Sequence, residues 1–349
     1  MAAPGKLARR PADGSAASGG AGVLTSRDNR WLKEFRMALR GGLPTESGFV
    51  GVEGVRLTEE ALQSGCPIAA VLFSETGERH RERLAPFLHS DQIAFPILRT
   101  TDRLFEGLAD TEHPQGVAAL VKPRVATLDD LLSATTIASA EACSPLLVVL
   151  AGVQDPGNVG TILRTAAAFG ATGAVTAASG QSGTASPFSP KALRASAGAA
   201  LHLPILAGMP LGILLTQLKL ANVHTLASSS HVAPSIGARH AVPAPNERSE
   251  HVNVAAGFSL SPATADTFRT AVHSDSTAPL LPWQVDWCQP IALLVGNEGA
   301  GLPEEIERSA DARIRIPMAS GVESLNAAAA AAVLFYEAAR QRTAQNQKT

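Results

Sequence analysis

The sequence predicts an α/β protein of two units, the second of which is an open parallel sheet with helices on both faces. Residues 145–152 (PLLVVLAG) and 291–295 (IALLV) are continuous apolar runs, which are typical of parallel strands buried on both sides. Helical and strand patterns alternate from residue 145 to residue 342, as expected for such a sheet. A chain of 349 residues is also long enough to build two separate cores.

The composition favours a globular protein and argues against a membrane-spanning, secreted or disulfide-rich one. The apolar content of 45% suits a globular chain, and no run of about 18 uncharged apolar residues predicts a membrane span. The first residues lack the apolar segment of a secretory signal. Cys66, Cys143 and Cys288 are too few and too scattered for a disulfide framework or a zinc site. We therefore expect a cytoplasmic protein without a membrane partner.

The charge is unevenly distributed, although the formal net charge of the whole chain is only −2. Residues 1–40 contain eight Lys and Arg side chains and three acidic ones. Such a leading segment either holds phosphate groups or is a solvated tail. Residues 1–28 are rich in Gly, Ala and Ser, so we expect them to form a disordered basic arm.

Residues 29–122 are predicted to form the first unit, and residues 123–145 a linker that contains one short helix. A helix is expected over residues 29–39, because Trp31, Leu32, Phe35 and Leu39 recur at helical spacing. The expected strands are 49–52, 69–73, 93–98 and 116–121, with helices near 58–64, 79–88 and 101–109. Arg79, Arg81 and Arg83 fall on one of these helices, as phosphate contacts or as a solvated basic face.

Residues 146–342 are predicted to form the second unit, followed by a tail at 343–349. The expected strands are 145–152, 173–177, 203–206, 222–227, 291–295 and 312–316, and the expected helices are 158–169, 190–197, 211–220, one from Pro303 and 324–342. Residues 229–286 interrupt the alternation with six prolines and with His231, His240, His251 and His273. The spacing of these histidines fits no compact metal site, so we predict a mobile surface insertion.

Three motifs follow predicted strands, at the edge where open α/β sheets bind ligands. In the first, residues 153–171, a turn at Asp155–Asn158 leads into a helix that carries Arg164. Gly160 allows another part of the chain to approach the backbone closely. The motif lacks G-x-G-x-x-G and a P-loop, which argues against a nucleotide-dependent oxidoreductase.

The second and third motifs supply further polar side chains. Residues 293–306 (LLVGNEGAGLPEEI) place Gly296 and Glu298 in a glycine-rich turn after a buried strand. Residues 315–342 place Ser324 and Asn326 at the start of the last helix, where an N-cap would explain one of the two. The alanines at 327–332 give this helix a slim face, suited to close approach by the same chain or by a second subunit.

In this order the three motifs resemble the SpoU (TrmH-like) family of the SPOUT superfamily, the RNA ribose 2′-O-methyltransferases. The first unit, through residues 49–62 and 113–121, is similar to that family's substrate-binding domain, which looks like RNA-binding ribosomal proteins. Residues 191–205 (KALRASAGAALHLPI) match as well. The resemblance extends over about residues 29–342, apart from the insertion, which is longer than is usual in the family.

The resemblance implies a fold, a cofactor and an assembly. The parallel sheet would end in a trefoil knot, and S-adenosylmethionine would lie bent in that knot. The positions that match the family's cofactor site are Gly296, Ile316 and Leu325. The family works as a homodimer in which both subunits contribute to each site.

The resemblance also assigns the catalytic positions, which are Arg164, Asn158, Glu298, Ser324 and Asn326. A guanidinium stays protonated at neutral pH and is a poor base, so we expect Arg164 to stabilise negative charge on the 2′-oxygen. The asparagines and Ser324 would orient the ribose and Arg164. Glu298 would fix Arg164 or Asn326 through charge-assisted hydrogen bonds.

The expected partner is structured RNA. The two-unit layout is similar to enzymes that act on a guanosine of large-subunit ribosomal RNA, and transfer RNA is the second choice. Two alternative interpretations remain. One is a resistance methylase that acts on a ribosomal adenosine, and the other is a non-catalytic RNA-binding or ribosome-assembly protein with the same fold.

Overall fold

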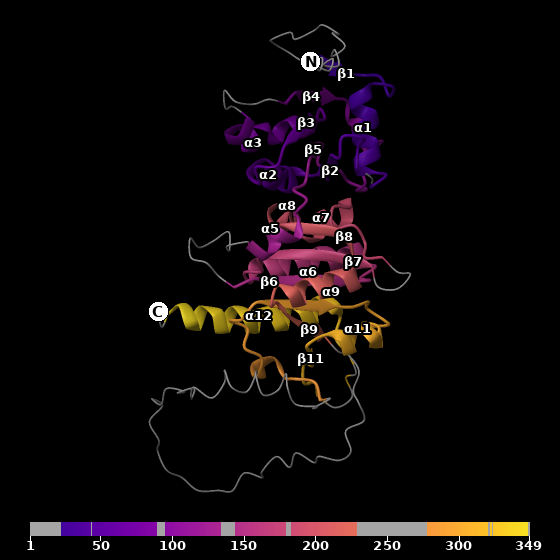
Figure 1. Cartoon of the computed structure of the whole chain (residues 1–349). Helices are drawn as coiled ribbons and strands as arrows, with labels where there is room; N and C mark the ends of the chain where they lie inside the picture. Colours follow the sequence, from indigo (N-terminus) through magenta and orange to yellow (C-terminus); the bar gives the residue numbers. More distant parts are fainter. Residues whose placement is uncertain are drawn as a thin grey trace, which may run out of the picture.

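The computed structural model describes residues 22–42, 44–88, 95–133, 144–178, 183–228, 278–319, 322 and 324–347. Figure 1 shows two α/β units stacked end to end, with the N-terminal unit at one end of the molecule. None of the helices in these ranges is long and apolar enough to cross a membrane.

The N-terminal unit is a five-stranded sheet with helices on both faces. Its strands follow the order β1 (Val23–Leu24), β4 (Ile97–Thr100), β3 (Ile68–Phe73), β5 (Val117–Val121) and β2 (Val50–Glu53), and β5 runs antiparallel to both of its neighbours. The side chains of β5 alternate between two clusters, which explains its uninterrupted apolar sequence. One face packs on α1 (Arg30–Leu39) and α4 (Asp102–Glu106), and the other on α2 (Val55–Gln63) and α3 (Arg81–Leu88).

Two features of this unit differ from the prediction. Val23 and Leu24, placed in the disordered arm, pair as β1 with Arg99 and Thr100, because β4 offers an open edge there. Residues 1–21 of the arm lie outside the described residues. The predicted helix at 79–88 is divided into a 3₁₀ turn, η1 (Gly77–His80), and α3, so the three arginines do not share one helix.

The second unit is a six-stranded sheet that is parallel throughout, as predicted. The order is β11 (Ala312–Ile314), β9 (His224–Ser228), β10 (Ile291–Val295), β6 (Leu146–Ala151), β7 (Gly173–Ala178) and β8 (Ile205–Pro210). Leu146, Val148 and Leu150 of β6 pack on one side of the sheet, while the residues between them pack on the other. Burial on both faces is therefore the reason for the continuous apolar run.

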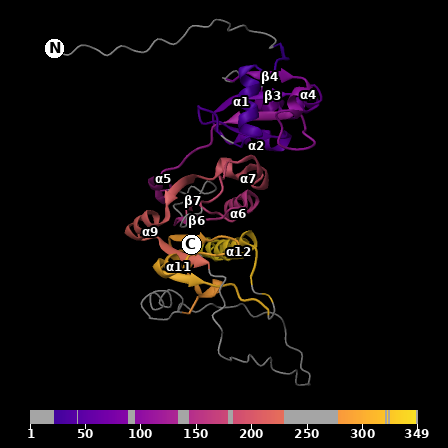
Figure 2. The same ribbon diagram turned by 90° about the vertical axis from the view of Figure 1, so that its right-hand side faces the viewer.

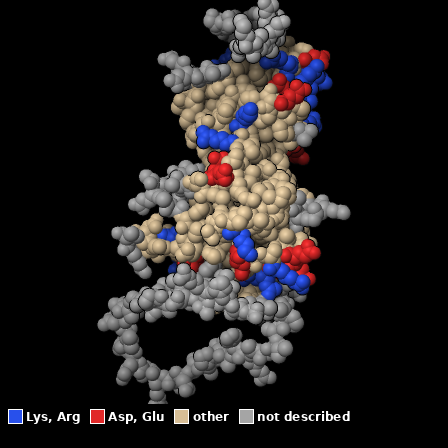
Figure 3. Space-filling view, in the orientation of Figure 1, with Lys and Arg blue, Asp and Glu red and all other residues tan. Residues whose placement is uncertain are grey.

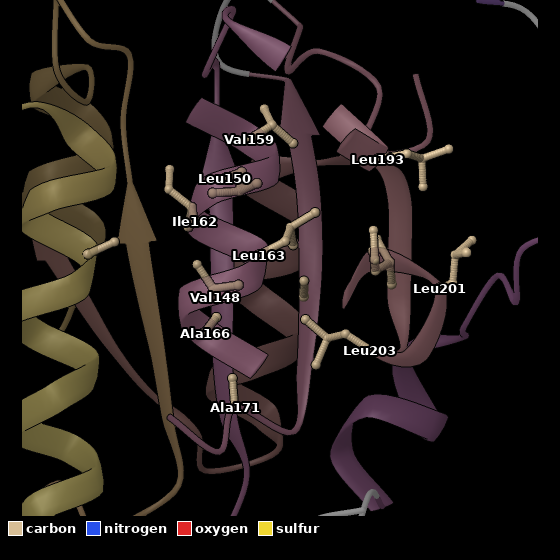
Figure 4. Close-up of a cluster of buried hydrophobic side chains, with 14 of the residues drawn as sticks. Val148, Leu150, Val159, Ile162, Leu163, Ala166, Ala171, Leu193, Leu201 and Leu203 are labelled. Carbon is tan, nitrogen blue, oxygen red and sulfur yellow. The ribbon is translucent and has the colours of Figure 1, made fainter. Parts of the chain in front are cut away.

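Helices cover both faces of this sheet, as Figure 2 shows. The first face carries α6 (Pro156–Ala168), α7 (Pro190–Ala195), α8 (Ala199–His202) and α12 (Ala327–Asn346), and the other carries α5 (Leu128–Ser133), α9 (Leu211–Leu220) and α11 (Glu304–Ser309). In Figure 4, Ile162, Leu163 and Ala166 of α6 lie over Val148 and Leu150. Fully burying an aliphatic side chain contributes about 1.5 to 3 kcal/mol, so this packing holds α6 firmly beside the sheet.

The boundaries of the second unit also differ from the prediction. The expected linker contributes to the fold, because Leu131 is fully buried and Val125 bridges to Ile205. The end of the predicted insertion is likewise ordered: residues 278–286 include a 3₁₀ turn, η2 (Pro282–Gln284), whose Pro282 carbonyl accepts a hydrogen bond from the buried Trp287 side chain. The four histidines of the insertion lie outside the described residues. The final helix begins at Ala327 rather than 324 and continues into the predicted tail.

The two units make direct contacts through α7 and α8. Arg194 of α7 forms an ion pair with Asp110 at 2.7 Å, and His202 of α8 lies 3.3 Å from Glu60 of α2. The backbone N–H of Asp110 donates to the buried carboxylate of Glu53 at 2.8 Å. These contacts attach the N-terminal unit to the helices that flank the start of α6.

Candidate active site

The three motifs meet at the carboxyl ends of β6, β10 and β11, where the start of α12 also lies. A pocket there has an empty volume of about 810 Å³, including its open mouth. Its lining contains five of the eight site residues named from the sequence, which are Gly296, Glu298, Ile316, Ser324 and Leu325. The remaining lining combines apolar side chains of β10 and α12 and Met318 with Ser228 and the loop residues Asn297, Gly299 and Gly301.

A hydrogen-bonded chain of three side chains connects the motifs beside this pocket. The Asn158 amide N–H donates to Glu298 Oε1 at 3.0 Å, and its carbonyl oxygen accepts from the Asn326 amide at 3.1 Å. A carboxylate can only accept hydrogen bonds, so Glu298 fixes which end of the Asn158 amide faces it. The central residue of the network is therefore Asn158. Within this chain Glu298 bonds to Asn158, whereas the sequence led us to expect Arg164 or Asn326 as its partner.

The loop that carries Glu298 is held by its neighbour Asn297. The Asn297 amide donates to the Gly152 carbonyl at 3.1 Å, and its side-chain oxygen accepts from the backbone of Gly299 and Ala300 at 2.9 and 3.0 Å. Asn297 thus joins the loop after β10 to the loop after β6. Asn297 was not singled out from the sequence, although an Asn in a turn commonly bonds to the backbone two residues on, as it does here to Gly299.

Gly296 is required by the close approach of two backbone segments. A Cβ atom built on Gly296 would lie 2.4 Å from the carbonyl carbon of Gly301, far inside a normal contact. Asn297 and Gly301 exchange two backbone hydrogen bonds of 3.0 Å, which hold the segments in this position. The glycine at this edge of the pocket therefore follows from the geometry of the turn.

Glu298 is largely exposed, but its carboxylate has four hydrogen-bond donors nearby. Partial burial raises the pKa of Glu298, whereas hydrogen bonds from Asn158 and from the backbone N–H groups of Glu298, Gln154 and Asp155 lower it. Together these hydrogen bonds outweigh burial, and the pKa lies below its ordinary value. Glu298 is therefore a stable anion and a fixed acceptor at neutral pH.

The start of α6 is held by Asp155. Its side chain caps the helix by accepting from the Asn158 backbone N–H at 3.2 Å, and it forms an ion pair with Lys191 of α7. The hydrogen bond from Lys191 is the main reason that the pKa of Asp155 is lowered. Lys191 was not singled out from the sequence, because its partner lies 36 residues away along the chain.

Gly160 has a structural role in the same region. A Cβ atom there would lie 2.3 Å from the carbonyl oxygen of Ala192, so the close approach predicted for this glycine is made by α7. The alanine face of α12 is likewise occupied within this chain, because Ala328 and Ala331 are buried in the core. Ala331 also lines the pocket together with Ala327 and Ala330.

The two polar residues before α12 have separate roles. Asn326 is the N-cap, with its side-chain oxygen accepting from the Ala328 N–H at 2.8 Å, and its amide extends to Asn158. Ser324 lies outside the helix, exposed at the pocket. The N-cap role therefore explains Asn326. It does not explain Ser324, which lies exposed at the pocket.

Arg164 is placed differently from the other candidate residues. It lies six residues after Asn158 on α6, which is about 9 Å further along the helix axis and on another side of it. Its side chain is exposed, and it forms no hydrogen bond or ion pair with the parts of the chain that the structure describes. Within one chain, Arg164 is therefore outside the network around Asn158.

No metal site is found in this region. Across the described ranges, no group of three or more His, Cys, Asp or Glu side chains is arranged to hold a metal ion.

Comparison with protein families assigns the fold and the motifs together. The model of the SpoU rRNA Methylase family matches residues 145–246 and 250–336, which is more than half of the chain. The chain belongs to the SpoU rRNA methylase family. The resemblance found in the three motifs is thereby confirmed, and the SpoU fold accounts for the parallel sheet. A model described as an MRM3-like substrate binding domain matches residues 45–119, in the N-terminal unit.

Individual SpoU relatives extend over both units. An uncharacterized tRNA/rRNA methyltransferase of Mycolicibacterium vanbaalenii is 32% identical over 81% of this chain and 74% of its own length. The 23S rRNA (uridine(2479)-2'-O)-methyltransferase of Streptomyces viridochromogenes is 28% identical over 91% of this chain and 92% of its own.

Solved structures of SpoU proteins share the fold. An rRNA methyltransferase from Sinorhizobium meliloti superposes with a TM-score of 0.65 and 26% identity, over 92% of this chain and 98% of that one. The SpoU methyltransferase AviRb from Streptomyces viridochromogenes, in complex with the cofactor AdoMet, gives a TM-score of 0.62 at 22% identity, over 90% and 100% of the two chains.

Proposed function

We propose that this protein transfers a methyl group from S-adenosylmethionine to a ribose 2′-hydroxyl of structured RNA. The observation that carries the proposal is that one pocket gathers Gly296, Ile316 and Leu325 together with Ser324 and Glu298. These residues come from two separate motifs of the sequence, and they are positions that match the cofactor and catalytic sites of the SpoU family.

The pocket suits S-adenosylmethionine in chemistry. Small-molecule sites are mostly apolar and carry a few fixed polar groups. Here Ile316, Leu325 and Leu334 offer apolar surface for a nucleobase, and the loop from Gly296 to Gly299 brings backbone to the pocket. When bound, the cofactor supplies an electrophilic methyl group on a positively charged sulfur.

The residues of the chain would position the ribose and stabilise charge. A 2′-hydroxyl is a poor nucleophile, so alignment and stabilisation of the developing negative charge are the main tasks. Glu298 and Asn326 hold the Asn158 amide in one orientation. Asn158, Asn326 and the exposed Ser324 would orient the ribose, while Arg164 would stabilise the 2′-oxygen and a neighbouring phosphate. The proton would leave to phosphate or water.

The position of Arg164 supports a homodimer. Its guanidinium extends from an exposed side of α6 and lacks a partner among the described residues of its own chain. In a dimer whose subunits share each site, Arg164 of one copy would complete the network of the other. The trefoil knot implied by the family stays a prediction.

Large-subunit ribosomal RNA is the proposed target. The matched family is named for the methylation of rRNA, and the Streptomyces viridochromogenes relative is named as a 23S rRNA methyltransferase. That relative modifies a uridine. Our prediction of a guanosine therefore needs a direct test, and transfer RNA is the second choice.

The test is methyl transfer with radiolabelled S-adenosylmethionine and unmodified transcripts of large-subunit ribosomal RNA and transfer RNA. Nuclease digestion and nucleoside analysis then identify the labelled ribose. We expect label on the 2′-oxygen of one nucleotide of the ribosomal transcript. Label on a base would contradict the proposed chemistry. RNA binding without any transfer would support a non-catalytic RNA-binding or assembly protein instead.

A further inference from the structure

The outer face of α1 carries a row of basic side chains that the matched families do not assign. Arg30, Lys33, Arg36 and Arg40 recur every three or four residues, so at about 100° per residue they share one side of the helix. The opposite side, with Leu32, Phe35 and Leu39, is fully buried on the sheet. The helix precedes residues 45–119, which are the part that matches the substrate-binding domain.

These charges are available to a ligand. Lys33, Arg36 and Arg40 line a shallow groove on the surface. In the described part of the chain only Lys33 of this row is in an ion pair, with Asp28 at 3.1 Å, and both side chains are more than half exposed. Exposed pairs of this kind contribute little, so Lys33 can exchange Asp28 for another anion. The row is about 15 Å long, because Arg30 and Arg40 are ten residues apart and each residue rises about 1.5 Å along the helix axis.

Basic residues on the other side of the N-terminal unit differ in that they have acidic partners. Figure 1 places α3 across the N-terminal unit from α1. There Arg81 pairs with Glu78 and Arg83 pairs with Glu59. These acidic neighbours compensate the charge, so α3 is a solvated mixed surface. Figure 3 likewise shows charges of both signs in small groups over this view of the molecule.

The row on α1 leads toward the candidate active site. Gly42, two residues after Arg40, lies against Pro190, the first residue of α7: a Cβ atom on Gly42 would be 3.4 Å from Pro190 Cδ. The next residue, Lys191, pairs with Asp155 at the start of α6. In Figure 1 the C-terminal end of α12 points away from the side of the molecule on which α1 lies, so α12 begins on that side.

We infer that the face formed by Arg30, Lys33, Arg36 and Arg40 binds the phosphate backbone of the substrate RNA and directs it, past Lys191, to the site at Asn158. The inference deepens the proposed function and rests on it. Its basis is charge complementarity, because a row of cations, of which only Lys33 has an acidic partner among the described residues, matches the regular phosphates of a nucleic-acid strand. Such contacts set the position of the RNA and carry no sequence preference.

The test is the salt dependence of RNA binding by the full chain. The probe is a large-subunit ribosomal RNA transcript, with a short mixed-sequence RNA hairpin as a second probe. Each lost phosphate contact lowers the slope of log affinity against log salt by about 0.7 to 0.9. The variant Lys33→Gln/Arg36→Gln/Arg40→Gln is therefore expected to lower the slope by about 2 to 3. Glutamine keeps the helix, being a good helix former.

The matched control removes the same charge from the opposite side, as Arg79→Gln/Arg81→Gln/Arg83→Gln, and is expected to keep the slope of the wild type. An unchanged slope in the α1 variant, or equal losses in both variants, would overturn the inference. Single variants Lys33→Gln and Arg36→Gln, each expected to lose just under one unit of slope, serve if the triple variant does not fold. Titration with S-adenosylmethionine separates the two proposals: failure of the wild type to bind it rejects the proposed function, whatever the slopes.

Discussion

Replacing Glu298 by Gln tests whether this carboxylate acts through Asn158. Glu298 accepts one hydrogen bond from the Asn158 amide at 3.0 Å and two from backbone N–H groups at 3.4 Å. Glutamine has the same shape, but half of its acceptor capacity is replaced by an NH₂ group that cannot accept from Asn158. In either orientation this NH₂ group faces a donor, Asn158 or the Gln154 N–H, so the change should weaken the hold on the Asn158 amide without opening a cavity.

The expected effect on activity is much larger than the effect on stability. Hydrogen bonds to charged groups contribute about 1.5 to 3 kcal/mol when sheltered, but Glu298 is largely exposed, so we expect a loss below about 1 kcal/mol. A misplacement of about 1 Å at a reacting centre costs about 10²-fold in rate. Turnover should thus fall by up to about 10²-fold, with little change in KM for RNA.

The assay is methyl transfer to the ribosomal transcript, with thermal unfolding of each variant. Glu304→Gln on α11 is the matched control, because Glu304 is also an exposed glutamate whose carboxylate has a partner, Arg308, and it lies outside the pocket lining. A double-mutant cycle with Asn158→Ala adds the decisive readout. If Glu298 positions Asn158, the double variant should be little worse than Asn158→Ala alone. Fully additive losses, or normal turnover of Glu298→Gln, would refute the positioning role.

Three further predictions follow from the site. Arg164→Ala should lower turnover by roughly 10² to 10³-fold, the effect of losing one charge-stabilising donor, with an almost unchanged dissociation constant for S-adenosylmethionine; near-normal turnover would remove Arg164 from the mechanism. Gly296→Ala should abolish S-adenosylmethionine binding in calorimetry, because its Cβ would meet the Gly301 backbone at 2.4 Å, whereas Gly212→Ala on α9, which is outside the pocket lining and has no neighbour within 4 Å of its Cβ, should bind normally. The pKa of Glu298 is lowered in the folded protein, so its ionised form stabilises the fold at pH values above the ordinary glutamate pKa of about 4.3. This stabilisation is lost as the pH falls through the lower pKa of the folded state. The difference in unfolding free energy between wild type and Glu298→Gln should accordingly be constant from neutral pH to about 5 and vanish in stronger acid; a difference that persists unchanged there would contradict the assignment.

The parallel sheet could be predicted because its strands carry a strong local signal. Residues 146–151 are apolar at every position, and both sets of alternating side chains are buried. By contrast, Val23–Leu24 is too short to show any periodicity, and its pairing depends on the open edge of a strand about 75 residues away. The division of 77–88 into a 3₁₀ turn and a helix also follows from contacts that no local pattern encodes.

Residues that the structure brings together at the pocket were named from the sequence, but the connections among them were not. Glycine-rich turns and polar side chains after buried strands indicated where Glu298, Asn158 and Asn326 would lie. The hydrogen bonds among them join residues 140 and 168 positions apart, so their partners depend on how the loops fold together. For the same reason the pairing of Lys191 with Asp155 was missed, and Arg164 was expected in contacts that one chain does not make.

The central claim, that the pocket between the ends of β10 and β11 and the start of α12 holds S-adenosylmethionine, is tested most directly by calorimetric titration of the full chain with that cofactor. We predict saturable binding by the wild type and by Gly212→Ala, and none by Gly296→Ala. Absence of binding by the folded wild type, or equal affinity in all three proteins, would contradict it.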